Sequence, residues 1–127
     1  MAHWADDYVG RPFKRLGRGP HYFDCYGLVR LVLHEQHGIL LPSYSEDDPD
    51  GWSIEGHAIA HKRVTEPKPL DVAILYTDVR VGLTWKSAPV HIGIFINEKN
   101  ILHVEEGMCS RAQPASDLRI HSIVRVT

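Results

Sequence analysis

The sequence predicts an α+β domain in which N-terminal helices pack on an antiparallel β-sheet. One segment with helical periodicity lies in the first third of the chain, and several β-rich segments follow in its second half. Helices that precede a run of strands, rather than alternating with them, are typical of this class. The length of 127 residues suits a single domain, residues 1–127, with one core.

The composition excludes several kinds of protein and partner. Hydrophobic residues make up 43% of the chain, and the net charge is -2 with both signs mixed. We therefore expect no nucleic-acid partner and no membrane partner. No apolar run approaches the roughly 20 residues that span a bilayer, and no signal peptide is recognisable. We therefore expect a chain that is made in the cytoplasm, or that leaves it by a route this sequence does not encode. Two cysteines are too few for a disulfide scaffold.

A loop rich in glycine and proline is expected before the main helix. Residues 2–9 are predicted to form a short helical turn, and Gly10 to Pro20 to form a basic loop. The positive charges of this loop either attract acidic groups of a substrate or keep the loop soluble, and the sequence leaves both open. The basic residues are Arg11, Lys14, Arg15 and Arg18.

The main helix is predicted from Cys25 to His37. Apolar residues recur at the i, i+3, i+4 and i+7 spacing that places them on one helix face. Asp24 is a favourable N-cap residue, and Gly38 is typical of the position just past a helix end. The residues of this face are Cys25, Leu28, Val29 and Val32.

The second half of the chain is predicted to form the sheet. A weaker helix over residues 53–64 comes first, and an internal glycine lowers its helix propensity. Segments rich in β-branched and aromatic residues then follow. They are Asp71 to Tyr76, Val90 to Ile96, Asn100 to Glu105 and Leu118 to Val126, with Val79 to Trp85 as a candidate further strand.

Cys25 stands at the predicted start of the main helix, a favourable place for a nucleophilic thiol. A free cysteine has a pKa of about 8.5, so little thiolate is present at neutral pH. The unpaired N–H groups and the dipole of a helix N-terminus stabilise a thiolate and can donate hydrogen bonds to an oxyanion beside it. The alternative is that Cys25 is a small buried hydrophobic residue. Cys109 has no such helix behind it, and we expect a free structural thiol there.

Two histidines are candidates for the base and for the group that orients it. A nucleophilic cysteine needs a base, usually His, and the base needs a partner. His91 and His103 lie on the two strands of a predicted hairpin. They share a face only if the pairing has an even index sum, which places residue 93 or 95 opposite His103. We predict this register; the alternative is that one histidine is an ordinary surface residue.

Three motifs, FDCYGLV, HIGIFI and ILHV, together resemble the NlpC family of papain-like cysteine peptidases. The family pattern is an Asp-Cys-Ser-Gly-Leu-Val helix start, a His-x-Gly strand, and a second polar residue, commonly His, on the next strand. The segment KPLDVAIL also resembles the Gly-Asp-Leu/Val strand entry of the family. The resemblance extends from about Trp4 to Arg125.

The resemblance implies a papain-like cysteine peptidase fold with a Cys-His-His triad. Cys25 would be the nucleophile, His91 the general base and His103 the orienting residue, acting through a thioester intermediate. Family members cleave peptide bonds in peptidoglycan stem peptides, typically between D-glutamate and a diamino acid. Family members require no cofactor and no metal ion. The resemblance implies that the partners of this chain are those stem peptides.

Three departures from the family pattern concern the substrate more than the thiol chemistry. Tyr26 replaces the usual Ser, as in the phage-tail branch of the family, where Trp or Tyr follows the nucleophile. Phe13 stands where many members have a tyrosine hydroxyl in the active site, so Tyr8 or Tyr22 would have to supply that group. Leu70 replaces a Gly and is expected to affect a turn. The candidate substrate-binding residues are Phe13, Tyr22, Asp24 and Tyr26.

Three functions remain open from the sequence. The first is a cysteine endopeptidase of cell-wall peptides, associated with a virion through phage tail proteins. The second is a catalytically weak or inactive structural module of a phage tail with the same fold. The third is an acyltransferase or amidase that uses the same Cys–His site on another substrate. The sequence indicates no oligomeric state.

Two further groups of residues have simpler interpretations. His57 and His61 are four residues apart on the weaker helix and either hold a metal ion or face solvent. Their order relative to Glu55 is not the His-Glu-x-x-His of metalloproteases, so we expect a solvated face. Trp52 and Trp85 either line a cleft or, as we expect, pack in the core or at its rim.

Overall fold

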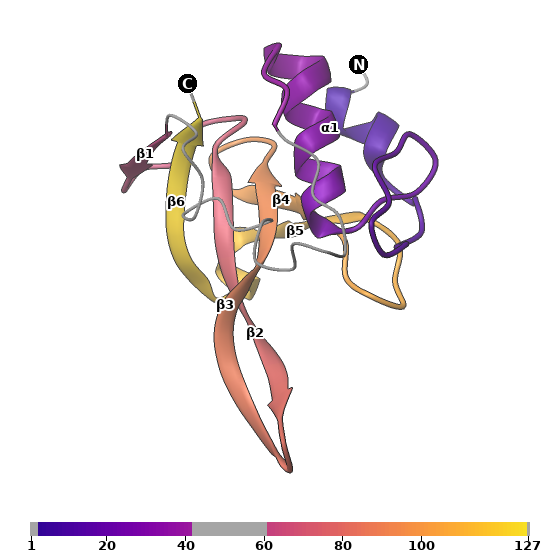
Figure 1. Cartoon of the computed structure of the whole chain (residues 1–127). Helices are drawn as coiled ribbons and strands as arrows, with labels where there is room; N and C mark the ends of the chain where they lie inside the picture. Colours follow the sequence, from indigo (N-terminus) through magenta and orange to yellow (C-terminus); the bar gives the residue numbers. More distant parts are fainter. Residues whose placement is uncertain (1–2, 42–60, 127) are drawn as a thin grey trace.

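One α-helix packs on a six-stranded antiparallel sheet in the computed structural model, which describes residues 3–41 and 61–126 (Figure 1). The helices are η1 (Trp4–Tyr8), α1 (Cys25–His37) and η3 (Ala115–Asp117). The strands are β1 (His61–Val64), β2 (Val72–Val81), β3 (Thr84–Phe95), β4 (Asn100–His103), β5 (Arg111–Pro114) and β6 (Ile120–Val126), in the spatial order β1-β6-β2-β3-β4-β5. The α+β prediction is thus confirmed. In the described ranges, no helix combines the length and the apolar character needed to cross a bilayer.

The helix α1 begins and ends where the sequence predicts. The Asp24 side chain accepts a hydrogen bond from the Gly27 N–H at 2.7 Å and so caps the first turn. Gly38 ends the helix with a φ of 71°, and its N–H donates to the His34 carbonyl at 3.2 Å. The predicted turn near the N-terminus is also present, as the 3-10 helix η1.

A separate cluster of apolar residues packs on each face of the sheet. The larger cluster packs α1 on the sheet and includes Leu28 from the helix and Ile92, Ile94 from β3. The smaller cluster lies on the other face and includes Phe95 and Ile101. Because side chains alternate along a strand, these two clusters assign residues 91–95 of β3 and the residues of β4 to one face or the other.

Two edge strands differ from the sequence prediction. Residues 61–64, predicted as the end of the weaker helix, form β1, and this strand pairs with β6 from His61 opposite Val126 onward. Pairing with the edge of the sheet outweighs the helix propensity of this short segment. The rest of that predicted helix, residues 53–60, lies outside the described residues. The strand β5 was not predicted, because four residues ending at Pro114 give too little pattern.

The strands β2 and β3 are longer than predicted and project from the sheet as a hairpin (Figure 1). Val81 pairs with Thr84, so a two-residue turn begins at Gly82, whose φ of 63° suits the first position of a type II′ turn. The segment Val79 to Trp85 is therefore the hairpin tip, and its prediction as one strand was wrong. Trp85, expected in the core or at its rim, is 67% exposed there.

The entry to β2 is built around a buried carboxylate. Asp71 is 1% exposed, and Arg125 on β6 donates to its two oxygens at 2.9 and 2.8 Å. The Lys68 N–H donates a further hydrogen bond at 2.8 Å. Such bidentate pairing offsets the cost of burying the charge. The preceding Leu70 has a φ of 75°, so the replacement of glycine does fall on a turn, at a conformation that glycine adopts more easily.

Candidate active site

Cys25 is the first residue of α1, and the loop before it is held in place by Asp24. The Asp24 carboxylate accepts hydrogen bonds from the Gly27 N–H at 2.7 Å and the Leu16 N–H at 3.1 Å, and it pairs with Arg18 at 2.9 Å. One side chain therefore caps the helix and fixes the basic loop beside the thiol. Because Arg18 is already paired with a carboxylate, it attracts acidic ligands less than an isolated cation would.

Glycine at position 27 allows this loop to lie against the first turn of α1. A Cβ atom on Gly27 would lie 1.9 Å from the carbonyl oxygen of Gly17, so any side chain would force the two segments apart. Gly17 is also confined, since a Cβ atom there would lie 2.8 Å from the Lys14 carbonyl oxygen. The Asp-Cys-x-Gly motif thus encodes a close approach of two backbone segments next to the sulfur.

The strands β3 and β4 bring His91 and His103 together. Ile94 pairs with Leu102, an even index sum that confirms the predicted register and puts Gly93 opposite His103. The Nε2 atom of His91 lies 3.0 Å from the Nδ1 atom of His103, and the two rings meet edge to face. His103 is completely buried, whereas His91 is partly exposed.

Gly93 leaves the space that the buried histidine occupies. A Cβ atom on Gly93 would lie 2.6 Å from the Cγ2 atom of Ile101 and 3.1 Å from the Cβ atom of His103. A larger residue here would therefore press on His103. This is a physical reason for the His-x-Gly pattern that the sequence shows.

A third polar side chain extends the histidine pair. The Nε2 atom of His103 lies 2.5 Å from the Oε1 atom of Gln113 on β5. The Nδ1 atom of His103 also lies 3.7 Å from a Glu105 carboxylate oxygen, and Arg111 lies 3.7 Å from the same oxygen. Gln113 was not predicted as a site residue, because the short strand β5 was not predicted and no motif marks this glutamine.

The sulfur of Cys25 lies near β3 at the level of Ile92. The N–H groups of Ile92, Tyr26 and Cys25 all act on the thiol in favour of the thiolate. The two imidazoles point to the sheet face away from the body of α1, since Ile92 belongs to the face that α1 covers. Within the described part of the chain, no hydrogen bond joins the sulfur to either ring, and catalytic hydrogen bonds often tighten only with substrate.

Burial dominates the protonation of the three groups. Loss of water raises the pKa of Cys25 to about 11, and the Asp24 carboxylate acts in the same direction. Loss of water lowers the pKa of His91 to about 4, with a further lowering by the neighbouring His103. Burial also lowers the pKa of His103, against the effect of its hydrogen bond to Gln113. At pH 7 the thiol and both imidazoles are therefore neutral, and stabilisation of a thiolate by the helix N-terminus is outweighed in this conformation.

The candidate substrate-binding residues differ in exposure. Tyr22 is 42% exposed, and the Nζ atom of Lys14 lies 4.4 Å from its ring centroid. Phe13 is partly buried against the core, and Tyr26 is 1% exposed within it. Asp24 is occupied by the contacts described above. Substrate binding by these four residues stays a prediction, and burial does not favour direct contact through Tyr26.

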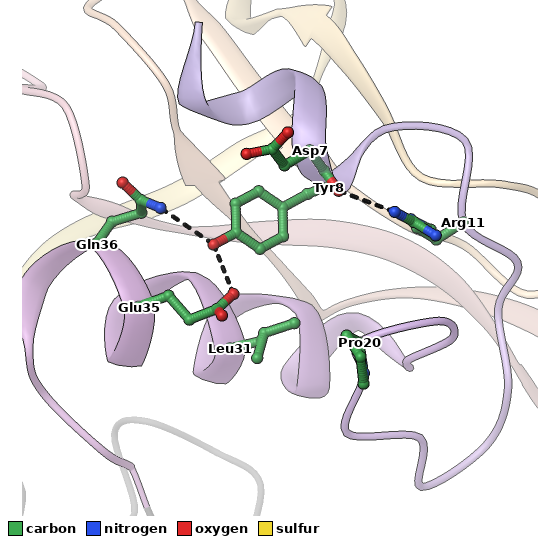
Figure 2. Close-up of a pocket in the computed structure, with 7 residues that line it drawn as sticks. All are labelled: Asp7, Tyr8, Arg11, Pro20, Leu31, Glu35 and Gln36. Atoms are coloured by element: carbon green, nitrogen blue, oxygen red, sulfur yellow. Dashed lines mark hydrogen bonds between the residues drawn. The ribbon is translucent and has the colours of Figure 1, made fainter.

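The Tyr8 hydroxyl does not replace the hydroxyl missing at Phe13. In the pocket drawn in Figure 2, it donates to Glu35 at 2.8 Å and accepts from the Gln36 amide at 3.2 Å. With a rise of about 1.5 Å per residue, Glu35 lies about 15 Å along the helix axis from Cys25. Burial, helped by Glu35, raises the pKa of Tyr8 to about 12, so the hydroxyl stays protonated in this network.

One group of side chains among the described residues has the spacing of a metal site. His91, His103 and Glu105 place their ligand atoms within 4.8 Å of one another. The hydrogen bond between the imidazoles already uses the Nε2 atom of His91 and the Nδ1 atom of His103, so an ion bound through these two atoms would have to displace it. The absence of a metal requirement stays a prediction. The other candidate pair includes His57, which lies outside the described residues.

Both cysteines are free, as the sequence analysis expected. Cys25 is partly exposed, and Cys109 is exposed on the segment that pairs with Pro12. No disulfide therefore removes the thiol at position 25 from chemistry.

Comparisons with known proteins agree on one family. The NlpC/P60 family model matches residues 10–125. The chain is 32% identical over 92 residues to the gamma-DL-glutamyl hydrolase of Bacillus subtilis (strain 168), and 28% identical over 99 residues to the probable peptidoglycan endopeptidase LytE of the same organism. These alignments cover 72% and 78% of the chain but 19% and 25% of the relatives, so the chain spans a quarter of their length or less.

Solved structures of the same family share the fold. The NlpC/p60 domain of the peptidoglycan hydrolase SagA matches with a TM-score of 0.65 and 19% identity, over 96% of this chain and 92% of that one. NlpC2 from Trichomonas vaginalis matches with a TM-score of 0.62 and 18% identity, over 94% of this chain and 42% of that one. At these identities the likeness shows the papain-like α+β fold.

Proposed function

Since the chain belongs to the NlpC/P60 family, we propose that it is a cysteine peptidase that hydrolyses amide bonds in peptidoglycan stem peptides. Of the two relatives, one is named a gamma-DL-glutamyl hydrolase and the other a probable peptidoglycan endopeptidase. The first name supports a glutamyl bond as the target here, and the second supports peptidoglycan as the material that contains it. The proposed triad is Cys25 as nucleophile, His91 as general base and His103 as the residue that orients the base.

The observation that carries this proposal is the hydrogen bond between His91 and His103. It joins two imidazoles at 3.0 Å, and His91 is the sequence neighbour of Ile92, whose N–H group acts on the Cys25 sulfur. Nucleophilic catalysis by cysteine needs a base that a second group orients, and this pair of imidazoles is such an arrangement. Ordinary core packing does not require two adjacent neutral imidazoles, because burying polar rings costs free energy.

The proposed mechanism is general-base catalysis rather than attack by a preformed thiolate. As the sulfur attacks the scissile carbonyl carbon, its proton passes to the free nitrogen of His91, and N–H groups at the start of α1 stabilise the oxyanion. His91 then donates this proton to the leaving amine, and a thioester remains on Cys25. Water, deprotonated by His91, hydrolyses the thioester and restores the thiol. Proton transfer accompanies the attack because the thiol and the imidazole are neutral in the free protein.

The test is digestion of purified peptidoglycan and of isolated stem peptides, with new amino groups and product masses measured over time. The wild-type protein is expected to release peptides, and the Cys25→Ala variant to release none above background. Cys109→Ala is the matched control, because it removes the exposed thiol on another segment and should leave the rate unchanged. Equal release by the wild type and by Cys25→Ala would contradict the proposal.

A second candidate function is a non-catalytic module of the same fold, and the resemblance around Tyr26 is the reason for considering a phage tail as its location. The observation in its favour is the raised pKa of Cys25, about 11, which leaves the thiol protonated at neutral pH. Alkylation of Cys25 as a function of pH, with and without stem peptide, separates the two. A substrate-dependent rise in alkylation near neutral pH supports the peptidase, and a rate that rises only in alkali with or without peptide supports the module.

An added amine separates hydrolysis from acyl transfer by the same Cys–His site. With stem peptide and a primary amine present together, a peptidase is expected to yield the free carboxylic acid. A new amide, detected by its mass, would instead indicate the acyltransferase. Association with phage tail proteins is tested by probing purified virions for the protein.

A further inference from the structure

We infer that Gln113 is a positioning residue that sets the tautomers of His103 and His91, and this inference rests on the proposed function. The three side chains form one chain of hydrogen bonds across three neighbouring strands. The contact from Gln113 to His103 is 2.5 Å, and that from His103 to His91 is 3.0 Å. Gln113 is the outermost member and reaches the base only through His103.

The register of β4 and β5 places Gln113 correctly for this contact. Ile101 pairs with Gln113 and His103 with Arg111, so all four residues share one face of the sheet. Gln113 therefore reaches His103 diagonally, within the range of cross-strand neighbours. His103 is completely buried, so no water competes freely for its Nε2 atom.

The direction of the hydrogen bonds follows from the amide oxygen of Gln113. This oxygen only accepts, so the Nε2 atom of His103 must carry a proton. In a neutral imidazole the Nδ1 atom of His103 is then an acceptor, and the Nε2 atom of His91 must donate to it. The Nδ1 atom of His91 is left unprotonated, which is the state that a base needs.

Removal of the Gln113 acceptor would leave His103 free to choose the other tautomer. Its Nδ1 atom could then hold the proton, with the Glu105 carboxylate 3.7 Å away as an alternative acceptor. In that state His103 no longer accepts from His91, and the Nδ1 atom of His91 is no longer kept free. The charged groups facing the pair are Glu105, which favours protonated imidazole, and Arg111, which disfavours it.

The experiment measures ring tautomers by 15N NMR of histidine-labelled protein, together with kcat and KM for stem peptides. In the wild type, we expect a protonated Nε2 on both rings and an unprotonated Nδ1 on His91. In Gln113→Leu, we expect mixed tautomers. We also expect kcat to fall by up to about 10-fold with KM nearly unchanged, because a wrong tautomer of a triad histidine removes the base. Gln36→Leu is the matched control, since it breaks a glutamine hydrogen bond to Tyr8 at the other end of α1.

The variant Gln113→Glu keeps the acceptor and adds a negative charge. We expect it to retain the wild-type tautomers and to move the acidic limb of the pH profile of kcat/KM to higher pH, because the charge favours the imidazolium. Unchanged tautomers in Gln113→Leu, or an unmoved acidic limb in Gln113→Glu, would overturn the inference. The tautomers are read without substrate, so a tautomer change in a protein that hydrolyses nothing would leave this inference standing while the proposed function fails.

Discussion

The two halves of the β2–β3 hairpin are both paired antiparallel, with a register shift between them, but they have opposite surroundings. The first four residues of β2 and the last four of β3 are buried, whereas the outer residues of both strands are largely exposed. The inner half lies between β6 and β4 and under α1. In the outer half, the two strands form backbone pairs only with each other (Figure 1). His91 stands where the strand passes from one half to the other. Precise placement of a reactive group needs neighbours on several sides, and only the inner half provides them.

The electrostatic consequences of the two environments also differ. On the inner half, loss of water lowers the pKa of His91 to about 4. On the outer half, Asp78 pairs with Arg119 at 3.3 Å while both stay more than half exposed. Such a surface pair contributes little to stability. Burial thus changes the chemistry of one end of the strand and leaves the other end ordinary.

The largest difference is expected in activity. On the proposed function, His91→Gln removes the base, and kcat should fall by about 10² to 10⁴, the usual contribution of a general base. Lys86→Gln, on the outer half of the same strand, should leave kcat within about 2-fold, since surface substitutions rarely disturb a distant site. Steady-state kinetics on stem peptides measures both, and equal losses would contradict the distinction between the halves.

Stability should show the next largest difference. Ile94→Ala on the inner half should lower the free energy of unfolding by about 2–5 kcal/mol, because it leaves a cavity in the core. Leu83→Ala at the hairpin tip should change it by less than about 0.5 kcal/mol, since Leu83 is 92% exposed. Urea denaturation of the two variants gives both values. A tip variant as costly as the core variant would mean that the tip is buried in solution.

The pH dependence of stability should follow His91. Its pKa falls from an ordinary value near 6.5 to about 4 on folding, so between these pH values the unfolded chain binds the proton and the folded chain does not. Stability should therefore increase as the pH rises from 4 to 6.5, by up to about 3 kcal/mol from this group. His91→Gln should flatten that dependence, and Lys86→Gln should keep it. Denaturant midpoints at several pH values decide the point, and an unaltered slope in His91→Gln would count against a buried neutral imidazole.

A smaller effect should separate two glycines of the same strand pair. Gly93→Ala pushes on Ile101 and His103 and should cost about 1–3 kcal/mol through overpacking, with a loss of activity on the proposed function. Gly82→Ala at the tip meets open space and should cost about 1 kcal/mol through its positive φ alone. Thermal unfolding and peptide hydrolysis of each variant measure this. If Gly82→Ala lost activity as well, the tip would have to reach the site.

Several features were predictable because neighbouring residues determine them. The caps at Asp24 and Gly38 act within one helical turn, and the register of β3 with β4 follows from alternation and a short turn. The family motifs added Cys25, His91 and His103 as candidate members of one catalytic triad. Their roles in catalysis remain predictions that the proposed experiments address.

Other features depended on contacts that no short segment contains. The strand β5 has only four residues, and it forms because β4 offers an edge to pair with. Gln113 therefore escaped notice, although it contacts His103 directly. Residues 61–64 became a strand for the same reason, by pairing with β6. The sequence of a short segment does not specify which strand the segment will pair with.

The sequence by itself determined the α+β class, the bounds and caps of α1, the even register of His91 and His103, and the family. Only the tertiary structure decided that Gln113 contacts His103, that the Tyr8 hydroxyl binds at the far end of α1, and that burial raises the pKa of the Cys25 thiol. The physical reason is range: capping and periodicity act over a few residues, whereas desolvation and hydrogen-bond partners depend on every segment that packs nearby.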